Sequence, residues 1–219
     1  ALAQGAPVKL GVILPRAGQS AANGKQIEGA IKLYMAQNGS TVAGRKIELI
    51  IKDDTGVADT TRRIAQEFVV NDKIDVLAGF GLTPLALATA PIATQSKTPM
   101  VVTAAATSII TEQSPYIVRT SFTLPQVSVG IAEWAAKNKI RKVVTFVADY
   151  GPGIDAEKFF KSQFKLNGGE IIGEIRSPLR SPDFAPCLQK WADLKPDAVF
   201  VVLPAGQGAA CRGKFVYGG

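Results

Sequence analysis

The feature that most restricts the fold is a repeated alternation of short apolar runs with longer amphipathic ones. Apolar runs typical of β-strands lie at 8–14, 46–52, 75–80, 100–104, 142–148, 170–175 and 198–203. Segments with helical spacing lie at 27–38, 64–71, 83–96, 126–138, 154–167 and 184–194, and a further helix begins at 207. Runs such as VVTFVA and AVFVV are apolar without a break, as expected when both faces of a parallel sheet are covered. The pattern therefore predicts an α/β fold with doubly wound parallel sheets.

The alternation is interrupted once, by an extended segment at 116–125, and then starts again. We therefore expect two lobes, an N-terminal α/β lobe over 1–120 and a C-terminal α/β lobe over 121–219. In doubly wound sheets, ligands bind at the carboxyl ends of the strands. The candidate site loops are those that follow strands, at 15–24, 53–58, 80–84, 104–111, 149–154 and 204–208.

Residue types that many catalytic sites need are missing from this chain. It has no histidine and two cysteines, which excludes Ser-His-Asp and Cys-His nucleophile systems and zinc sites built from three histidines or four cysteines. Carboxylate chemistry remains possible, but no pattern favours it. We predict no catalytic residue, metal or cofactor. Whether Cys187 and Cys211 form a disulfide is left open, because the sequence gives no geometry.

The charge balance is basic, with 25 Lys and Arg against 18 Asp and Glu and a formal net charge of +7. A basic chain can bind nucleic acid, but its cations then gather in a patch and alternate with aromatic residues. Here the densest groupings are the pairs Arg62-Arg63 and Arg141-Lys142. We therefore expect a solvated cationic surface and no nucleic-acid partner.

Two glycine-rich loops are similar to nucleotide-binding motifs, and each departs from its pattern. The loop from Gly18 to Gly24 has five residues between its glycines where a phosphate loop has four, and Gln26 stands where a Ser or Thr would bind magnesium. The loop that begins at Gly79 has Pro84 where the third glycine of a dinucleotide fingerprint belongs. A nucleotide-using, Rossmann-like enzyme stays open as an alternative.

A second kind of site is suggested by hydroxyl groups in loops after two neighbouring strands. The loop at Leu82-Thr83 precedes a helix, where free amides and the helix dipole favour an anionic group. The next loop offers Thr107 and Ser108 among small residues. A helix cap or turn is the alternative role for each threonine, but together the loops predict a pocket for a carboxylate.

Motifs in chain order carry a resemblance to a known family. They include VKLGVILP with GQSAANG, then KIELIIKDDTGVADTTRRIAQEFV, DVLAGFGLTPLALATAPIA and TPMVVTAAATSIIT, and, as the most specific, YIVRTSFTLPQ and VVTFVADYGPG. Over essentially the whole chain, the sequence resembles the periplasmic solute-binding proteins of branched-chain amino acid-type ABC transporters, the leucine/isoleucine/valine-binding group. The resemblance implies the type I periplasmic binding protein fold, whose two lobes close on a small molecule.

Site residues follow from this resemblance position by position. It implies that Thr83 and Thr107 hold the carboxylate of the ligand, beside Leu82, and that Ala105 contributes a backbone contact. Tyr150 matches the aromatic residue that the second lobe closes over the ligand.

The resemblance assigns four more residues to the rim of the site. Asn23 lies near a position that touches the side chain of the ligand. Ala205 and Gln207 match a contact loop of the second lobe, where this chain lacks the aromatic residue of the family. Arg16 is a further candidate for contact with a carboxylate, with a surface position as the alternative.

The implied function is that of an extracytoplasmic solute-binding protein of an ABC importer, not of an enzyme. We expect it to bind a small carboxylated solute, an amino acid or an aromatic or other organic acid, between its lobes and to deliver it to a membrane permease. Residues 1–3, Ala-Leu-Ala, resemble the end of a signal peptide cleaved near Ala3, which predicts a periplasmic location. Family members are longer, so we expect an incomplete second lobe. A ligand-sensing domain of a regulator or receptor stays open as a further alternative.

Overall fold

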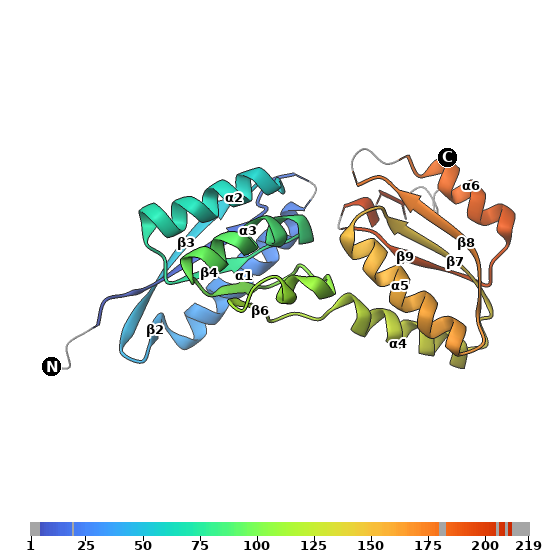
Figure 1. The fold of residues 1–219 in the computed structure, drawn as a ribbon, viewed down its shortest axis with the longest axis horizontal. Helices are drawn as coiled ribbons and strands as arrows, with labels where there is room; N and C mark the ends of the chain where they lie inside the picture. Colours follow the sequence, from blue (N-terminus) through green and yellow to red (C-terminus); the bar gives the residue numbers. More distant parts are fainter. Residues whose placement is uncertain (1–4, 19, 180–182, 205, 209, 212–219) are drawn as a thin grey trace. The chain divides into compact units, whose positions relative to one another are not determined.

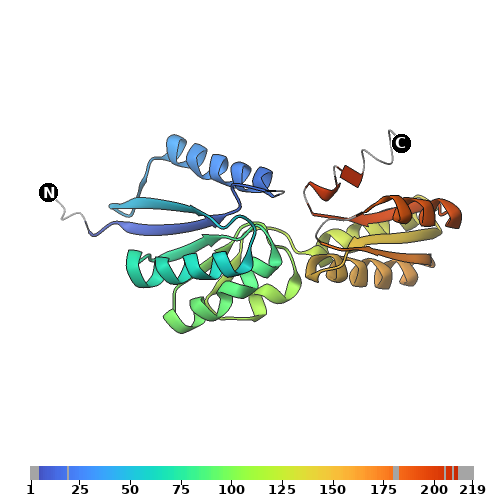
Figure 2. The same ribbon diagram turned by 90° about the horizontal axis from the view of Figure 1, so that it is seen from above.

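The fold is seen in a computed structural model, shown in Figure 1 and Figure 2. The structure describes residues 5–18, 20–179, 183–204, 206–208 and 210–211. The chain divides into two compact units, Ala1–Ser121 and Phe122–Gly219. Each unit has a parallel sheet and a core of its own, and the two are described separately.

In the first unit, the described residues form a six-stranded sheet in the order β2-β3-β1-β4-β5-β6. All neighbouring strands are parallel except β2, which pairs with β3 in the antiparallel sense. The strands are β1 (Val8–Leu14), β2 (Thr41–Val42), β3 (Arg45–Asp53), β4 (Val76–Gly79), β5 (Met100–Val102) and β6 (Ile117–Arg119). Because β1, β4, β5 and β6 run in the same direction, the loops after them meet at one edge of the sheet.

Helices cover both faces of this sheet, as Figure 2 shows. They are α1 (Ala21–Asn38), α2 (Ala58–Glu67), a π-helical turn (Phe68–Asp72), α3 (Thr83–Ser96) and a 3-10 turn (Ser108–Glu112). Ile13 packs in the cluster that includes residues of α2 and α3, whereas Val12 and Leu14 pack with Ile27 and Ile31 of α1. Successive side chains of a strand point to opposite faces. The apolar run at 10–14 in β1 is therefore explained by burial on both sides.

In the second unit, the described residues form a three-stranded parallel sheet in the order β8-β7-β9. Its elements are α4 (Leu124–Lys137), β7 (Lys142–Ala148), α5 (Gly151–Leu166), β8 (Glu170–Ser177), α6 (Ala185–Leu194) and β9 (Ala198–Val202). Phe146 of β7 meets Phe184 and Trp191 edge-on, with ring centroids 6.1 and 5.5 Å apart. Phe200 of β9 stacks on Phe160 of α5. This sheet, too, is covered on both faces.

The predicted fold class, α/β with parallel sheets, is confirmed by this architecture. Four helices begin earlier than the apolar spacing predicts: α1, α2, α4 and α5. The difference arises because the first turns of these helices contain mostly small, polar or proline residues, which give no apolar periodicity in the sequence. In α4 the start is a capping box, in which the Thr123 amide donates to Gln126 Oε1 and the Gln126 amide to Thr123 Oγ1. None of the described helices is both long and apolar enough to span a membrane.

Candidate functional site

Two buried hydroxyl groups meet where the loops after β4 and β5 come together. Thr83 begins α3, and Thr107 precedes the 3-10 turn. Their Oγ1 atoms lie 2.7 Å apart, a hydrogen bond in which either can be the donor, and both side chains are buried. β4 and β5 are adjacent parallel strands, so their carboxyl ends place both loops at the same edge of the sheet. The structure thus brings together the two threonines that were predicted from the sequence to bind a carboxylate.

The loop that leads to Thr83 is held in an unusual backbone conformation. Gly79 has φ +114° and Phe80, which is not glycine, has φ +68°. The Gly79 carbonyl accepts hydrogen bonds from both the amide and the hydroxyl of Thr103, at 2.9 Å each. The Phe80 ring is fully buried, and its carbonyl accepts from the amide of Ala105. Positive φ is costly for a residue with a side chain and often occurs at functional sites. The hydrogen bonds to the Gly79 and Phe80 carbonyls, together with the buried Phe80 ring, hold the backbone in this conformation just before α3 begins.

The amino end of α3 lacks a side-chain cap. Leu82 occupies the N-cap position in an extended conformation and has no polar side-chain atom. Pro84 has no amide hydrogen, while the amides of Leu85 and Ala86 donate to the Leu82 carbonyl. The partial positive charge of a helix amino end attracts anions, and an uncapped end leaves that attraction available. This end lies beside the Thr83 hydroxyl.

Arg119 is a residue of this region that the sequence analysis did not select. It ends β6, and its Nη2 donates to the carbonyls of Thr107 and Ser108, at 2.8 and 3.4 Å. It thereby fixes the loop that carries the Thr107 hydroxyl and brings a positive charge to it. Its position at the end of the extended run in the motif YIVRTSF was the available signal.

Arg16 and Asn23, predicted at the rim, belong to the loop after β1 and the first turn of α1. The Arg16 amide donates to Asp53 Oδ1 at 2.8 Å, and its guanidinium lies 3.0 Å from Glu28 of α1. The hydrogen bond from Lys32, together with the charge of Arg16, holds the pKa of the Glu28 carboxyl below its usual value, although burial acts in the opposite sense. Arg16 thus pairs with a carboxylate of its own chain. Asn23 is half-buried in α1.

The glycines of the two loops that were compared with nucleotide motifs serve close packing. A Cβ on Gly24 would lie 2.0 Å from the Pro15 carbonyl oxygen, and one on Gly79 would lie 2.1 Å from that of Ile13. Both glycines therefore let the backbone pass close to the end of β1. Packing gives a sufficient reason for them without a bound phosphate.

In the second unit, Tyr150 and Gln207 lie after β7 and β9, at the carboxyl end of the sheet. Tyr150 is the N-cap residue of α5, in an extended conformation, and burial raises the pKa of its phenol to about 12. Gln207 is buried, and its Nε2 donates to the Leu179 carbonyl at 2.6 Å. Ala205, the third residue predicted in this unit, lies outside the described residues.

We expect the Tyr150 phenol to stay protonated where ordinary tyrosines ionise. In an absorbance titration of the folded protein through about pH 10, the phenolate signal of Tyr150→Phe should match that of the unaltered protein. The reason is that burial disfavours the charged phenolate. The chain has four tyrosines, so loss of about a quarter of the signal in the variant would contradict the expectation.

Comparisons with known proteins agree with this architecture. The family described as periplasmic binding protein matches residues 7–212. A curated relative, Leu/Ile/Val-binding protein homolog 6 of Brucella abortus (strain 2308), is 45% identical over 201 residues, which are 91% of this chain and 51% of the relative. The chain thus spans about half the length of the curated relatives it matches.

Solved structures of similar proteins carry aromatic acids. A solute-binding protein of an ABC transporter from Rhodopseudomonas palustris BisB5, in complex with 3,4-dihydroxybenzoic acid, is 59% identical with a TM-score of 0.94, over 96% of this chain and 58% of that one. Another from R. palustris, in complex with 4-hydroxybenzoate, is 38% identical with a TM-score of 0.94, at the same coverage. A third, from R. palustris HaA2 with p-hydroxybenzoic acid, is 40% identical with a TM-score of 0.90, over 97% and 60%.

Proposed function

This chain belongs to the periplasmic binding protein family, and we propose that it is part of an ABC importer's solute-binding protein that holds an aromatic carboxylic acid by its carboxylate. The observation that carries the proposal is the pair of buried hydroxyls, Thr83 and Thr107, with their Oγ1 atoms 2.7 Å apart. The motif-based resemblance to the leucine/isoleucine/valine-binding group is confirmed at the level of the family.

The chemistry of the hydroxyl pair suits a carboxylate. Each threonine hydroxyl has one proton to donate, and in the pair one of the two protons is used between them. A carboxylate offers two acceptor oxygens, so on binding the hydrogen bond between the two hydroxyls can be exchanged for one donated by each of them to the carboxylate. The two hydroxyl oxygens then move apart, because no proton is left between them. The uncapped amino end of α3 and the guanidinium of Arg119 add attraction for the negative charge. All of these groups belong to the first unit.

The aromatic class of the acid is supported by the solved relatives, which hold hydroxylated benzoic acids at identities up to 59%. A branched-chain amino acid is the alternative, since the curated relatives are named for leucine, isoleucine and valine. We propose a periplasmic location and a membrane permease as the partner that receives the solute. Binding and release leave the solute unchanged, so the proposal includes no enzymatic step. The signal-peptide cleavage predicted near Ala3 lies outside the described residues.

Calorimetric titration of the complete gene product tests the proposal. The panel contains benzoate, 4-hydroxybenzoate and 3,4-dihydroxybenzoate, with leucine, isoleucine and valine as the competing class. At least one of the aromatic acids should bind, and its uncharged amide should bind about 10- to 100-fold more weakly, the loss expected for a charge-assisted hydrogen bond. Binding of the amino acids alone would overturn the aromatic assignment. Equal binding of acid and amide would overturn the role of the carboxylate.

A further inference from the structure

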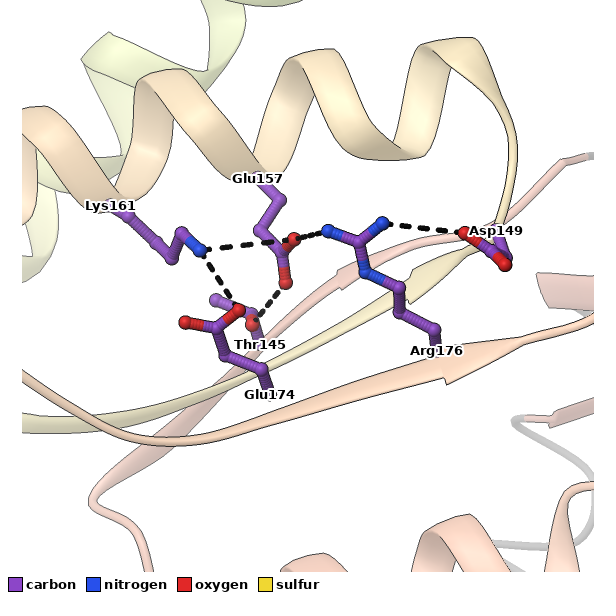
Figure 3. Close-up of polar contacts among 6 residues, drawn as sticks. All are labelled: Thr145, Asp149, Glu157, Lys161, Glu174 and Arg176. Atoms are coloured by element: carbon purple, nitrogen blue, oxygen red, sulfur yellow. Dashed lines mark hydrogen bonds and ion pairs between the residues drawn. The ribbon is translucent and has the colours of Figure 1, made fainter.

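The second unit contains a connected set of charged side chains that the proposed function does not use. Figure 3 shows Arg176 of β8 reaching between Glu157 of α5 and Asp149, which follows β7. Arg176 Nη2 lies 2.5 Å from Glu157 Oε2, and Nη1 lies 3.3 Å from Asp149 Oδ1. One guanidinium thus joins the interior of the unit to the turn that carries Tyr150.

The interior end of this set is fixed by the burial of Glu157. Its side chain is 1% exposed and accepts a hydrogen bond from Thr145 Oγ1 at 2.6 Å. A buried carboxylate without a partner is strongly unfavourable, so Glu157 must keep its cation. Burial acts to lower the pKa of the Arg176 guanidinium, but the charge of Glu157 and its hydrogen bond outweigh burial and raise that pKa. Arg176 is therefore held charged and in one place.

The other end of the set is the turn at Asp149 and Tyr150. The Asp149 amide donates to the Ser177 carbonyl at 2.7 Å, next in sequence to Arg176. Its carboxylate contacts the guanidinium, so both the backbone and the side chain of Asp149 are held to β8. The Tyr150 amide then donates to the Ala148 carbonyl at 2.9 Å, and Tyr150 is the N-cap residue of α5. The direction in which the Tyr150 side chain leaves the backbone depends on this turn.

We propose that Arg176, anchored by Glu157, is a positioning residue for solute binding that acts on Tyr150 through Asp149. The inference rests on the proposed function, because it takes Tyr150 as a residue that contacts the solute. A contribution to stability alone does not account for the contact between Arg176 and Asp149. Arg176 and Asp149 are 38% and 58% exposed, and an ion pair as exposed as this contributes little to stability. The effect of this ion pair is to restrict the conformations of the turn that carries Tyr150.

The same set of charged side chains contains a second ion pair, Lys161 with Glu174, that serves as a matched control. Lys161 lies 2.9 Å from Glu174, with exposed fractions of 25% and 47%, and Lys161 also faces Glu157. Figure 3 shows this pair on the side of Glu157 away from Asp149. Glu174→Ala therefore removes an ion pair of similar exposure without touching the turn that holds Tyr150.

The test is a set of affinities for 4-hydroxybenzoate, measured by calorimetry on the complete gene product. Asp149→Ala should weaken binding about fivefold, within the range of couplings between residues in contact, whereas Glu174→Ala should leave it within about twofold. Tyr150→Ala should weaken binding as well, and adding Asp149→Ala to it should cause no further loss. Both alanine variants of the acidic residues should keep the melting temperature of the unaltered protein within about 4 °C.

Three results would overturn the inference while leaving the proposed function intact. They are unchanged binding by Asp149→Ala, an equal loss in Glu174→Ala, and losses that simply multiply when Asp149→Ala is combined with Tyr150→Ala. If the unaltered protein binds no acid of the panel, the proposed function fails and the inference falls with it. The two kinds of failure are thus distinguished by the first titration of the series.

Discussion

Gly79→Ala is expected to destabilise the first unit by about 3 kcal/mol or more, since left-handed strain alone costs on the order of 1–3 kcal/mol. Gly79 has φ +114°, and a Cβ at this position would lie 2.1 Å from the carbonyl oxygen of Ile13. The obstacle is backbone in the central strand of a buried sheet, so it cannot turn aside as a side chain does. Urea denaturation followed by far-ultraviolet circular dichroism measures the loss.

Gly29→Ala is the matched control for this substitution. Gly29 lies in α1 of the same unit and is exposed, and a Cβ added to it would meet no atom of another element within 4 Å. Alanine in an exposed helix interior should therefore stabilise the unit by about 0.5–1 kcal/mol. An equal urea midpoint for Gly79→Ala and the unaltered protein would mean that the backbone after β4 does not pass as close to β1 as described.

Thr83→Val and Thr107→Val are each expected to weaken carboxylate binding about 10- to 100-fold, because each removes a donor to a charged group. Valine keeps the shape of threonine and removes its hydroxyl. Each single substitution should also lower stability by about 1–3 kcal/mol, because the partner hydroxyl is buried and loses its hydrogen bond. In the double variant no hydroxyl is left unpaired, so stability should partly return while binding is lost. Calorimetry and urea denaturation of all four proteins complete the cycle.

Thr89→Val controls for the general effect of removing a buried hydroxyl from α3. Thr89 is fully buried, and its hydroxyl donates to the Leu85 carbonyl of the same helix at 3.1 Å. That carbonyl also belongs to the helix's own bonding pattern, so affinity for the solute should not change. A loss of affinity in Thr89→Val equal to that in Thr83→Val would show that α3 as a whole, rather than the hydroxyl pair, determines binding.

The parts of the fold that the sequence predicted well are those whose apolar pattern is strong. Strands such as β4, β5 and β7 are buried on two faces, so nearly all of their residues are apolar and they stand out in the sequence. The meeting of Thr83 and Thr107 was predictable because each follows one of two consecutive strands, which here are adjacent in the sheet. Arg119 could not be assigned in this way: the motif YIVRTSF marks its position, but its contacts are with the backbone carbonyls of Thr107 and Ser108, and a sequence does not show which carbonyls an arginine reaches.

The hairpin of β2 and β3 shows why other elements were missed. Its turn has Ala43 and Gly44 at φ +50° and +74°. Positive φ at both central residues is usually signalled by Asn-Gly or Asp-Gly, and alanine gives no such signal. Lys97 and Lys195 also adopt the left-handed conformation where glycine is common, although the ends of α3 and α6 just before them were predicted correctly. Tertiary packing, rather than local preference, sets the backbone at these points.

The separate cores of the two units have an optical consequence. Both tryptophans of the chain, Trp134 on α4 and Trp191 in α6, belong to the second unit, and Trp191 is buried against Phe146. Indole emission depends on the immediate surroundings of the ring. The tryptophan fluorescence of this chain is therefore a spectroscopic reporter for the second unit, silent about the sheet that carries the hydroxyl pair.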